Sequence, residues 1–474
     1  MKTKKLFILI CNLLICMPLG NLLFSQHITN TIGTSGVFKI KDAATDLFKV
    51  NQSTGTIELS EHTGGYQSGS IFKGNDRFIH TYNAMGSIGC NTFVGINSGN
   101  FTLIGTSLSG SFNTAVGHST LNLLTTGSSN SAVGYFALYS NTIGEYNSAF
   151  GYLSLKDNTY GNNNSAFGSS SLANNETGSS NSAFGLQSLF SNNIGDNNSA
   201  FGYYSLRNNT LGFENSAFGF ESLFANTEGY LNCAFGESSL RNNTLGWENS
   251  AFGFGSLENN IVGRNNTAFG YQSLGQTTGN SNTAIGHNAG TGITTGSNNI
   301  VIGSNSSVPS NTASNQIRIG NNLITYAGIQ VAWTVTSDRR WKSNILSSNL
   351  GLNFISKLRP VSYTRKNDEN NRTEYGLIAQ EVEEVLKEEG VENSGMLTIT
   401  DEGNYELRYN DLLAPMIRSI QELNEKNDKL TSENAELKNE IEKLKSVQGK
   451  INTLEKMMNE LKQIGSKEVK LSGK

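Results

Sequence analysis

The stretch NSAFGYYSLRNNTLGFE, residues 198–214, is followed directly by NSAFGFESLFANTEGYL, residues 215–231, which repeats the same 17-residue pattern. A glycine recurs at this spacing from Gly117 to Gly270, over nine successive intervals. In all ten copies an asparagine stands four residues before that glycine, an alanine two before it and a leucine four after it. Helical-hairpin repeats and propeller blades need longer periods. The period therefore predicts a stack of short coils, each with a short strand, a turn, a second short element and a second turn.

The side chains of each predicted strand alternate between two faces. The phenylalanine and the serine or threonine share one face, and the alanine and asparagine share the other. We expect the phenylalanine and the leucine to stack into a narrow core, and the asparagines to form ladders along the array. The glycines mark corners where a positive φ or a close backbone approach is needed. The pattern does not distinguish a strand from a helical turn in the segment before the leucine.

Composition favours a thin repetitive core over one compact domain. Glycine accounts for 51 of the 474 residues and proline for 4, and 16% of the residues are charged. A disordered chain would carry more charge and proline, and collagen needs glycine at every third position. The net charge of −4 argues against a protein that binds nucleic acid through a basic surface.

The repeat region shows little that points to chemistry. Ten acidic and four basic side chains lie between residues 101 and 303, without a repeated carboxylate pair, a metal-binding cluster or a phosphate-binding loop. We therefore expect no metal and no cofactor. A passive stalk or head is the first interpretation, and a surface that binds a glycan or another cell-surface ligand is the alternative. The repeats resemble the head repeats of trimeric bacterial adhesins, which form a parallel β-roll.

The N-terminus has the pattern of a secretory signal peptide over residues 1–26. Lysines are followed by the apolar run Leu6–Phe24. Pro18 interrupts this run, so a membrane span is the weaker interpretation, and a lipidated Cys16 is a further alternative. We expect an exported protein, secreted or at the cell surface, without a transmembrane span in the mature chain.

Beyond residue 331 the proportion of charged residues rises and the repeat ends. Four motifs follow in order: TSDRRWKSNI at 336–345, LRPVSY at 358–363, YGLIAQEV at 375–382 and LRYNDLLAPMI at 407–417. Together they resemble the peptidase S74 family, the intramolecular chaperone domain of phage endosialidases and tail spikes, over residues 331–425. They are also similar to the self-cleaving segment of myelin regulatory factor. The resemblance implies a module that assembles three chains and then cuts the bond between Thr336 and Ser337.

The chemistry of such a cut needs an activated hydroxyl. The chain from Val331 to Lys474 contains no histidine, so a serine–histidine–aspartate triad within the module is excluded and a serine–lysine dyad is the available variant. Ser337 is the candidate nucleophile, and Lys342 is the candidate base, at the spacing of the family dyad. A lysine acts as a base only when neutral, so its pKa has to fall from about 10.4.

Neighbouring residues are candidates for lowering that pKa. Arg339 and Arg340 would supply positive charge, and Trp333 or Trp341 would exclude water. Asp338 and Arg339 are the candidate supporting residues of the site. The alternative is that Asp338, Arg339 and Arg340 form a solvated run of charge, and that the module folds and assembles chains without cutting.

A long helix is predicted at the C-terminal end. Apolar residues or asparagines recur at steps of three and four residues from Met416 to Leu461, with one additional three-residue step. This pattern predicts a coiled coil over 413–464, in which Asn427 and Asn434 set register and strand number. A membrane-surface helix is disfavoured by the narrow seam and the mixed charges.

The predicted fold is mainly β: a parallel β-roll or β-solenoid, then a small α/β chaperone domain that ends in a coiled-coil helix, in a homotrimer. The predicted segments are a signal peptide 1–26, an irregular region 27–100, the array 101–305, a linker with the last strands 306–330, the chaperone and autoprocessing domain 331–425, the coiled coil 413–464 and a flexible tail 465–474. The predicted function is an exported trimeric fibre or adhesin-like protein that cleaves itself once. One alternative is a polysaccharide-binding or polysaccharide-degrading spike with a non-cleaving module, and the degrading form needs two facing carboxylates. Another is a membrane-linked regulatory protein that frees its N-terminal part.

Overall fold

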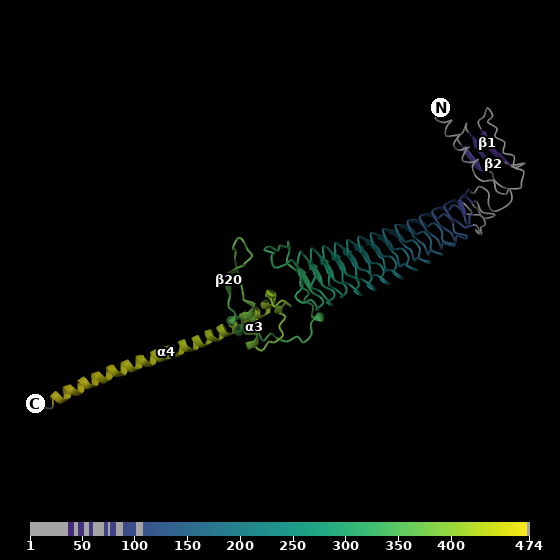
Figure 1. The fold of residues 1–474 in the computed structure, drawn as a ribbon. Helices are drawn as coiled ribbons and strands as arrows, with labels where there is room; N and C mark the ends of the chain where they lie inside the picture. Colours follow the sequence, from purple (N-terminus) through teal and green to yellow (C-terminus); the bar gives the residue numbers. More distant parts are fainter. Residues whose placement is uncertain are drawn as a thin grey trace. The chain divides into compact units, whose positions relative to one another are not determined.

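A computed structural model describes residues 37–41, 46–51, 56–59, 71–73, 76–81, 89–100 and 108–471. The predicted signal peptide, including Cys16, lies outside the described residues, as do residues 472–474 of the predicted tail. The chain divides into two compact units, Met1–Gly320 and Asn321–Lys474. Figure 1 labels several elements of the two units.

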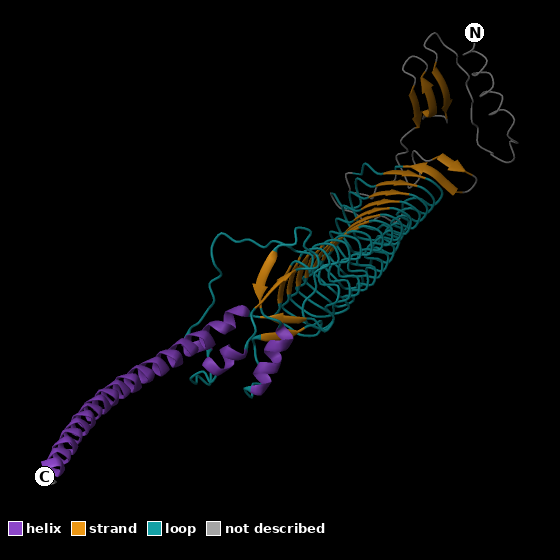
Figure 2. Ribbon diagram, turned by 90° about the vertical axis from the view of Figure 1, so that its left-hand side faces the viewer, coloured by secondary structure: helices purple, strands orange, loops and turns teal. Residues whose placement is uncertain are grey.

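The repeat region is a β-solenoid in which every coil adds one short strand to a long parallel sheet (Figure 2). Its parallel strands are β6 (Thr92–Val94), β7 (Thr114–Val116), β8 (Ser131–Val133), β9 (Ser148–Phe150), β10 (Ser165–Phe167), β11 (Ser182–Phe184), β12 (Ser199–Phe201), β13 (Ser216–Phe218), β14 (Cys233–Phe235), β15 (Ser250–Phe252), β16 (Thr267–Phe269), β17 (Thr283–Ile285), β18 (Ile300–Ile302) and β19 (Ile317–Ile319). The register follows the 17-residue spacing, so that Ala166 of β10 pairs with Ala183 of β11. The predicted mainly β solenoid is therefore confirmed.

Antiparallel strands precede the solenoid. β4 (Ile71–Lys73) and β5 (Asp76–His80) extend the long sheet, with β5 antiparallel to β6. β1 (Val37–Lys41), β2 (Asp46–Asn51) and β3 (Thr56–Leu59) form a separate antiparallel sheet.

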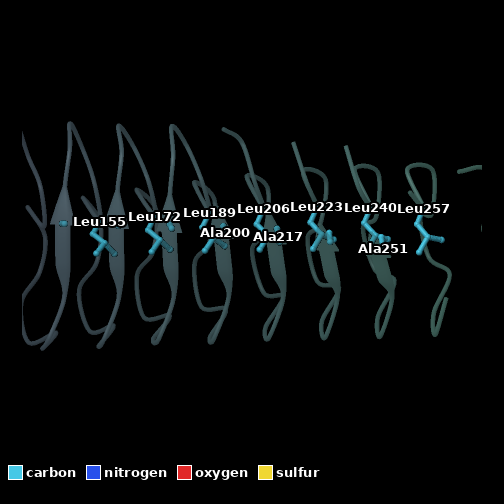
Figure 3. Packing of buried hydrophobic residues seen from close by; sticks show 14 of the residues in the cluster. Leu155, Leu172, Leu189, Ala200, Leu206, Ala217, Leu223, Leu240, Ala251 and Leu257 are labelled. Carbon is cyan, nitrogen blue, oxygen red and sulfur yellow. The ribbon is translucent and has the colours of Figure 1, made fainter. Parts of the chain in front are cut away.

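The composition of the solenoid core corrects one prediction. The leucine of each coil is fully buried, as expected, but its partner is the alanine of the strand: Leu206 and Ala200 are both 0% exposed. Figure 3 shows these leucines at equivalent places in successive coils. The phenylalanines lie on the opposite face, where Phe150 is 37% exposed. The interior is too narrow for a ring beside the leucine, so the small side chain points inward and strand alternation turns the phenylalanine outward.

Two columns of buried asparagines run through the solenoid. The predicted ladder is present: the backbone N–H of Asn215 donates to Oδ1 of Asn198 (3.1 Å), one coil earlier. A second column was not predicted, although an asparagine stands three residues before the second glycine in eight copies. There Nδ2 of Asn226 donates to Oδ1 of Asn209 (2.7 Å). Both Asn198 and Asn209 also donate to the carbonyl of Gly212 (2.8 Å each). These two hydrogen bonds stabilise the turn at Gly212.

Each coil holds residues other than glycine in the left-handed backbone region. In one coil, Tyr204, Leu206 and Glu214 have φ values of 59°, 49° and 55°. This conformation costs roughly 1–2 kcal/mol for each such residue. All three N–H groups donate to carbonyls of an adjacent coil, at 2.9–3.1 Å. A coil is therefore stable only against its neighbours. The segment before the leucine is a turn rather than a strand or a helical turn.

The predicted glycine corners are present, for two different reasons. Gly168 has a φ of 141°, and a Cβ placed there would lie 2.5 Å from the carbonyl oxygen of Gly185 in the next coil. At Gly178 the constraint is space, because a Cβ would lie 2.5 Å from the carbonyl oxygen of Gly195. Stacking at sheet distance leaves no room for a side chain at either corner.

The second unit is a small domain of short helices and two antiparallel two-stranded sheets, followed by a long helix. It contains η1 (Arg339–Trp341), α2 (Leu352–Lys357), β20 (Val361–Thr364), β21 (Thr373–Gly376), α3 (Ala379–Glu388), β22 (Leu397–Ile399), β23 (Tyr405–Leu407), η2 (Tyr409–Leu412) and α4 (Leu413–Leu471). Phe354 of α2, Val382 and Leu386 of α3, Met396 and Leu412 form its core. α2 packs against the first turns of α4.

Helix α4 has 59 residues and is continuous through Gly449, whose carbonyl accepts a hydrogen bond from Thr453 Oγ1 (2.9 Å). It includes residues 465–471, part of the predicted tail. None of the helices that the structure describes is long and apolar enough to cross a membrane.

Candidate autoproteolytic site

A short turn brings Ser337 and Lys342 together. The carboxylate of Asp338 caps η1 by accepting the backbone N–H of Arg340 (2.8 Å), and the N–H of Lys342 donates to the carbonyl of Arg339 (3.1 Å). This single turn places Nζ of Lys342 2.7 Å from Oγ of Ser337, within hydrogen-bonding distance. The geometry is that of a nucleophile in contact with its base.

Asp338 and Arg340 neutralise each other beside this pair. Nη2 of Arg340 lies 2.6 Å from Oδ2 of Asp338, and Nε also donates to both carboxylate oxygens. The hydrogen bonds from the Arg340 side chain and backbone lower the pKa of Asp338, and the same contact raises the pKa of Arg340. The positive charge of Arg340 is thus offset by a carboxylate, and Asp338 acts here as a helix cap and ion-pair partner.

Within one chain the candidate dyad is open to water. Ser337, Arg339 and Lys342 are exposed. The two indoles expected to exclude water are themselves largely solvated, with Trp333 75% and Trp341 81% exposed. Desolvation of Lys342 by these residues therefore does not occur in the isolated chain.

The segment around the dyad exposes many apolar side chains. Between residues 321 and 347 the structure describes no strand and no helix except η1. The exposed large apolar residues of this segment are Leu323, Ile324, Tyr326, Ile329, Val331, Trp333, Val335, Trp341, Ile345 and Leu346. Such a concentration of exposed apolar side chains is typical of a surface that contacts another molecule.

The seam of α4 is equally uncovered. Its large apolar residues from Met416 to Leu461 are between 42% and 67% exposed, and Leu430 and Leu437 are 56% and 55% exposed. Charged residues occupy the rest of the helix surface. Among the described residues, most of the length of α4 packs against no other element, and its exposed apolar seam is typical of a coiled-coil strand.

Side-chain contacts tie the second, third and fourth motifs into one fold. Arg359 of the second motif forms an ion pair with Glu381 of the third, which lowers the pKa of Glu381. The backbone N–H of Leu377 in the third motif donates to the Tyr409 hydroxyl in the fourth (2.9 Å). Among the described residues no three His, Cys, Asp or Glu side chains group as a metal site.

Glu422 has a structural role that the sequence did not indicate. Its Oε2 accepts the backbone N–H of Leu352 (2.8 Å) at the start of α2, and its Oε1 accepts from Nε of Arg418 (2.8 Å). The backbone hydrogen bond is the main cause of the lowered pKa of Glu422. The two partners lie 70 residues apart in the chain, so no spacing pattern links them.

Comparison with known proteins identifies the C-terminal module. No curated protein and no solved structure matches the chain. A family model does match, and its matched segment starts at the candidate nucleophile and extends beyond α3. Residues 337–391 thus match the Peptidase_S74 family, whose model is described as a chaperone of endosialidase.

Proposed function

We propose that the chain is an exported, trimeric fibre or adhesin-like protein whose C-terminal module assembles three copies and then cuts once between Thr336 and Ser337. A β-solenoid followed by a module of the endosialidase-chaperone family fits a tail-fibre-like protein with an intramolecular chaperone. The observation that supports the cut is the 2.7 Å contact between Lys342 Nζ and Ser337 Oγ.

The chemistry follows from this contact. Neutral Lys342 takes the proton of Ser337 Oγ as the oxygen attacks the carbonyl carbon of Thr336. The bond between Thr336 and the nitrogen of Ser337 breaks, and the protonated Lys342 returns the proton to that nitrogen. Water then hydrolyses the resulting ester, which leaves a carboxylate at Thr336 and a free amine at Ser337. The chain cuts itself once and does not turn over.

Assembly removes water from around Lys342, which is exposed to solvent in a single chain. A lysine in water is protonated at neutral pH, and desolvation is a general way to make it neutral. The exposure of Trp333 and Trp341, which are near the dyad in the sequence, and the exposed seam of α4 support burial by neighbouring copies. Cleavage is therefore coupled to assembly, and monomers remain intact.

The purified full-length protein tests this proposal by intact mass and by size. We expect two fragments, one ending at Thr336 and one beginning at Ser337. Ser337→Ala leaves the chain whole, because the nucleophile is gone. Lys342→Arg also leaves it whole, since a guanidinium does not lose its proton in proteins. Ser343→Ala is the matched control and should cut normally.

Two results would contradict parts of the proposal separately. Wild-type protein that is trimeric and uncut would retain the chaperone role and remove the protease. Cleavage of the Ser337→Ala variant at the same bond would show that another group is the nucleophile.

A further inference from the structure

The outer face of the long sheet is an uncharged stripe. In each strand from β6 to β19 the first and third residues point away from the core, and these positions hold only serine, threonine, cysteine, valine, isoleucine or phenylalanine. We call this surface the sheet stripe. The charged side chains between residues 101 and 303 all lie in the turns between strands.

Phenylalanines at the third position of β9 to β16 form a continuous stack along the sheet stripe. From Phe150 to Phe269, successive ring centroids are 4.5–5.4 Å apart. The face of each ring packs against the next ring, and the ring edges are exposed to solvent. Phe150 is 37% exposed and Phe269 57%, and at the C-terminal end Ile317 and Ile319 are 68% and 62% exposed.

The sheet stripe is large enough to contribute most of a protein–protein interface. Fourteen parallel strands at ~4.8 Å and three residues at ~3.3 Å each give roughly 650 Å². A standard interface covers ~800 Å² on each partner. The sheet stripe alone has nearly the size of one such interface.

We propose that the sheet stripe is the surface through which the solenoids of neighbouring copies pack, parallel and in register. This inference rests on the proposed assembly through α4, which brings identical chains together in the same direction. Around a cyclic symmetry axis each residue lies near its own copies, so any charge in the contact would meet a like charge. A surface free of charge over 14 successive strands is what such a self-contact requires.

A cysteine within the sheet stripe provides a test. Cys233 occupies the serine position of β14, pairs with Ser216 of β13, and is only partly exposed. In a full-length chain that also carries Cys11→Ser, Cys16→Ser and Cys90→Ser, a short bis-maleimide should join two copies. With one cysteine per chain the product is a covalent dimer on a denaturing gel. The single-ended reagent N-ethylmaleimide should label Cys233 much more slowly in the native protein than in urea.

Paired variants test whether the contact lies on this face. Phe218→Lys with Phe235→Lys places like charges beside Cys233 in every copy and should abolish cross-linking. Leu211→Lys with Leu245→Lys alters turn residues that are 46% and 49% exposed, and should leave it unchanged. The α4 seam is intact in both, so both should remain trimeric by light scattering.

The outcomes separate this inference from the proposed assembly. A trimer in which native Cys233 is labelled as fast as in urea and gives no covalent dimer would overturn the sheet-stripe contact alone. A monomer at working concentration would contradict the proposed assembly, and the sheet-stripe contact with it. The wild-type labelling rate decides the matter even if the lysine variants do not fold.

Discussion

Leucines of the solenoid and leucines of α4 have opposite surroundings. Leu155, Leu206 and Leu257 are 0% exposed because the next coil of the same chain covers them, whereas Leu430 and Leu437 are more than half exposed. The solenoid completes its core with the repeats of its own chain. The C-terminal helix has an apolar seam that is exposed in the part of the chain that the structure describes. Under the proposed function, the solenoid core is completed within one chain, and the seam of α4 is covered on assembly.

The two regions also differ in how they start to form. Much of the hydrogen bonding of a coil is with adjacent coils, since Leu206, Asn209 and Asn198 all bond to the coils beside them. Its left-handed residues make an isolated coil unfavourable. A long helix, in contrast, forms through contacts between residues that are close in the sequence. Trimerisation at α4 would raise the effective concentration of the shafts and favour growth from that end.

The largest expected effect comes from charging the seam. Leu430→Glu with Leu437→Glu places carboxylates where copies meet, and should convert the trimer to a monomer and stop cleavage at Thr336. Light scattering and intact mass measure the two losses together.

The matched control for the seam variant adds the same charges on the outer side of α4. Ser432→Glu with Asn439→Glu should remain trimeric and cleaved. Loss of assembly without loss of cleavage in the seam variant would break the proposed coupling between the two events.

A smaller effect is expected from the solenoid core. Leu206→Ala removes a side chain that is fully buried and should lower the free energy of unfolding by about 2–5 kcal/mol, through lost burial and a cavity. Leu211→Ala, at a turn residue that is 46% exposed, should change it by no more than about 0.5 kcal/mol. The shift in the thermal midpoint of the β signal measures both. Equal shifts would mean that the leucine column is not the core.

The smallest effect concerns pH and the cap of α2. The pKa of Glu422 is lowered in the folded state, mainly by the Leu352 N–H, so its ionised form stabilises the module above the unfolded pKa. That contribution is lost as pH falls through the lower, folded pKa. The thermal midpoint of Glu422→Gln should therefore depend less on pH than that of the wild type below pH ~4.5.

Glu425→Gln, one turn further along α4, is the control for Glu422→Gln and should follow the wild-type pH dependence. A Glu422→Gln profile that runs parallel to the wild type would show that this cap contributes nothing to the acid sensitivity of the module.

Periodicity was sufficient to predict the coil, the corner glycines and the first asparagine ladder, because each depends on a residue type repeated at one spacing. The core prediction failed at phenylalanine for a reason of size. Hydrophobicity ranks the ring above alanine for burial, but the strand residue buried in the same coil as Leu206 is Ala200. The second asparagine column is a repeat in the sequence, but its role is evident only in the tertiary structure, where Asn226 donates a hydrogen bond to Asn209.

The dyad was predicted by motif resemblance, and its surroundings were not. Spacing alone allows Ser337 and Lys342 to meet, and the structure places them in contact through η1. The pairing of Arg340 with Asp338 and the exposure of Trp341 depend on where side chains lie in three dimensions. That neighbouring side chains lower the pKa of Lys342 therefore stays a prediction, and it applies to the assembled protein.

By itself the sequence determined the 17-residue coil, the seam of the last helix and the family resemblance of the module, since all three are patterns along the chain. The tertiary structure alone decided which face of each strand is buried, that Glu422 caps a helix 70 residues away, and that the phenylalanines form an outer stack. Burial and long-range contacts depend on the space between segments, and no one-dimensional spacing encodes that space.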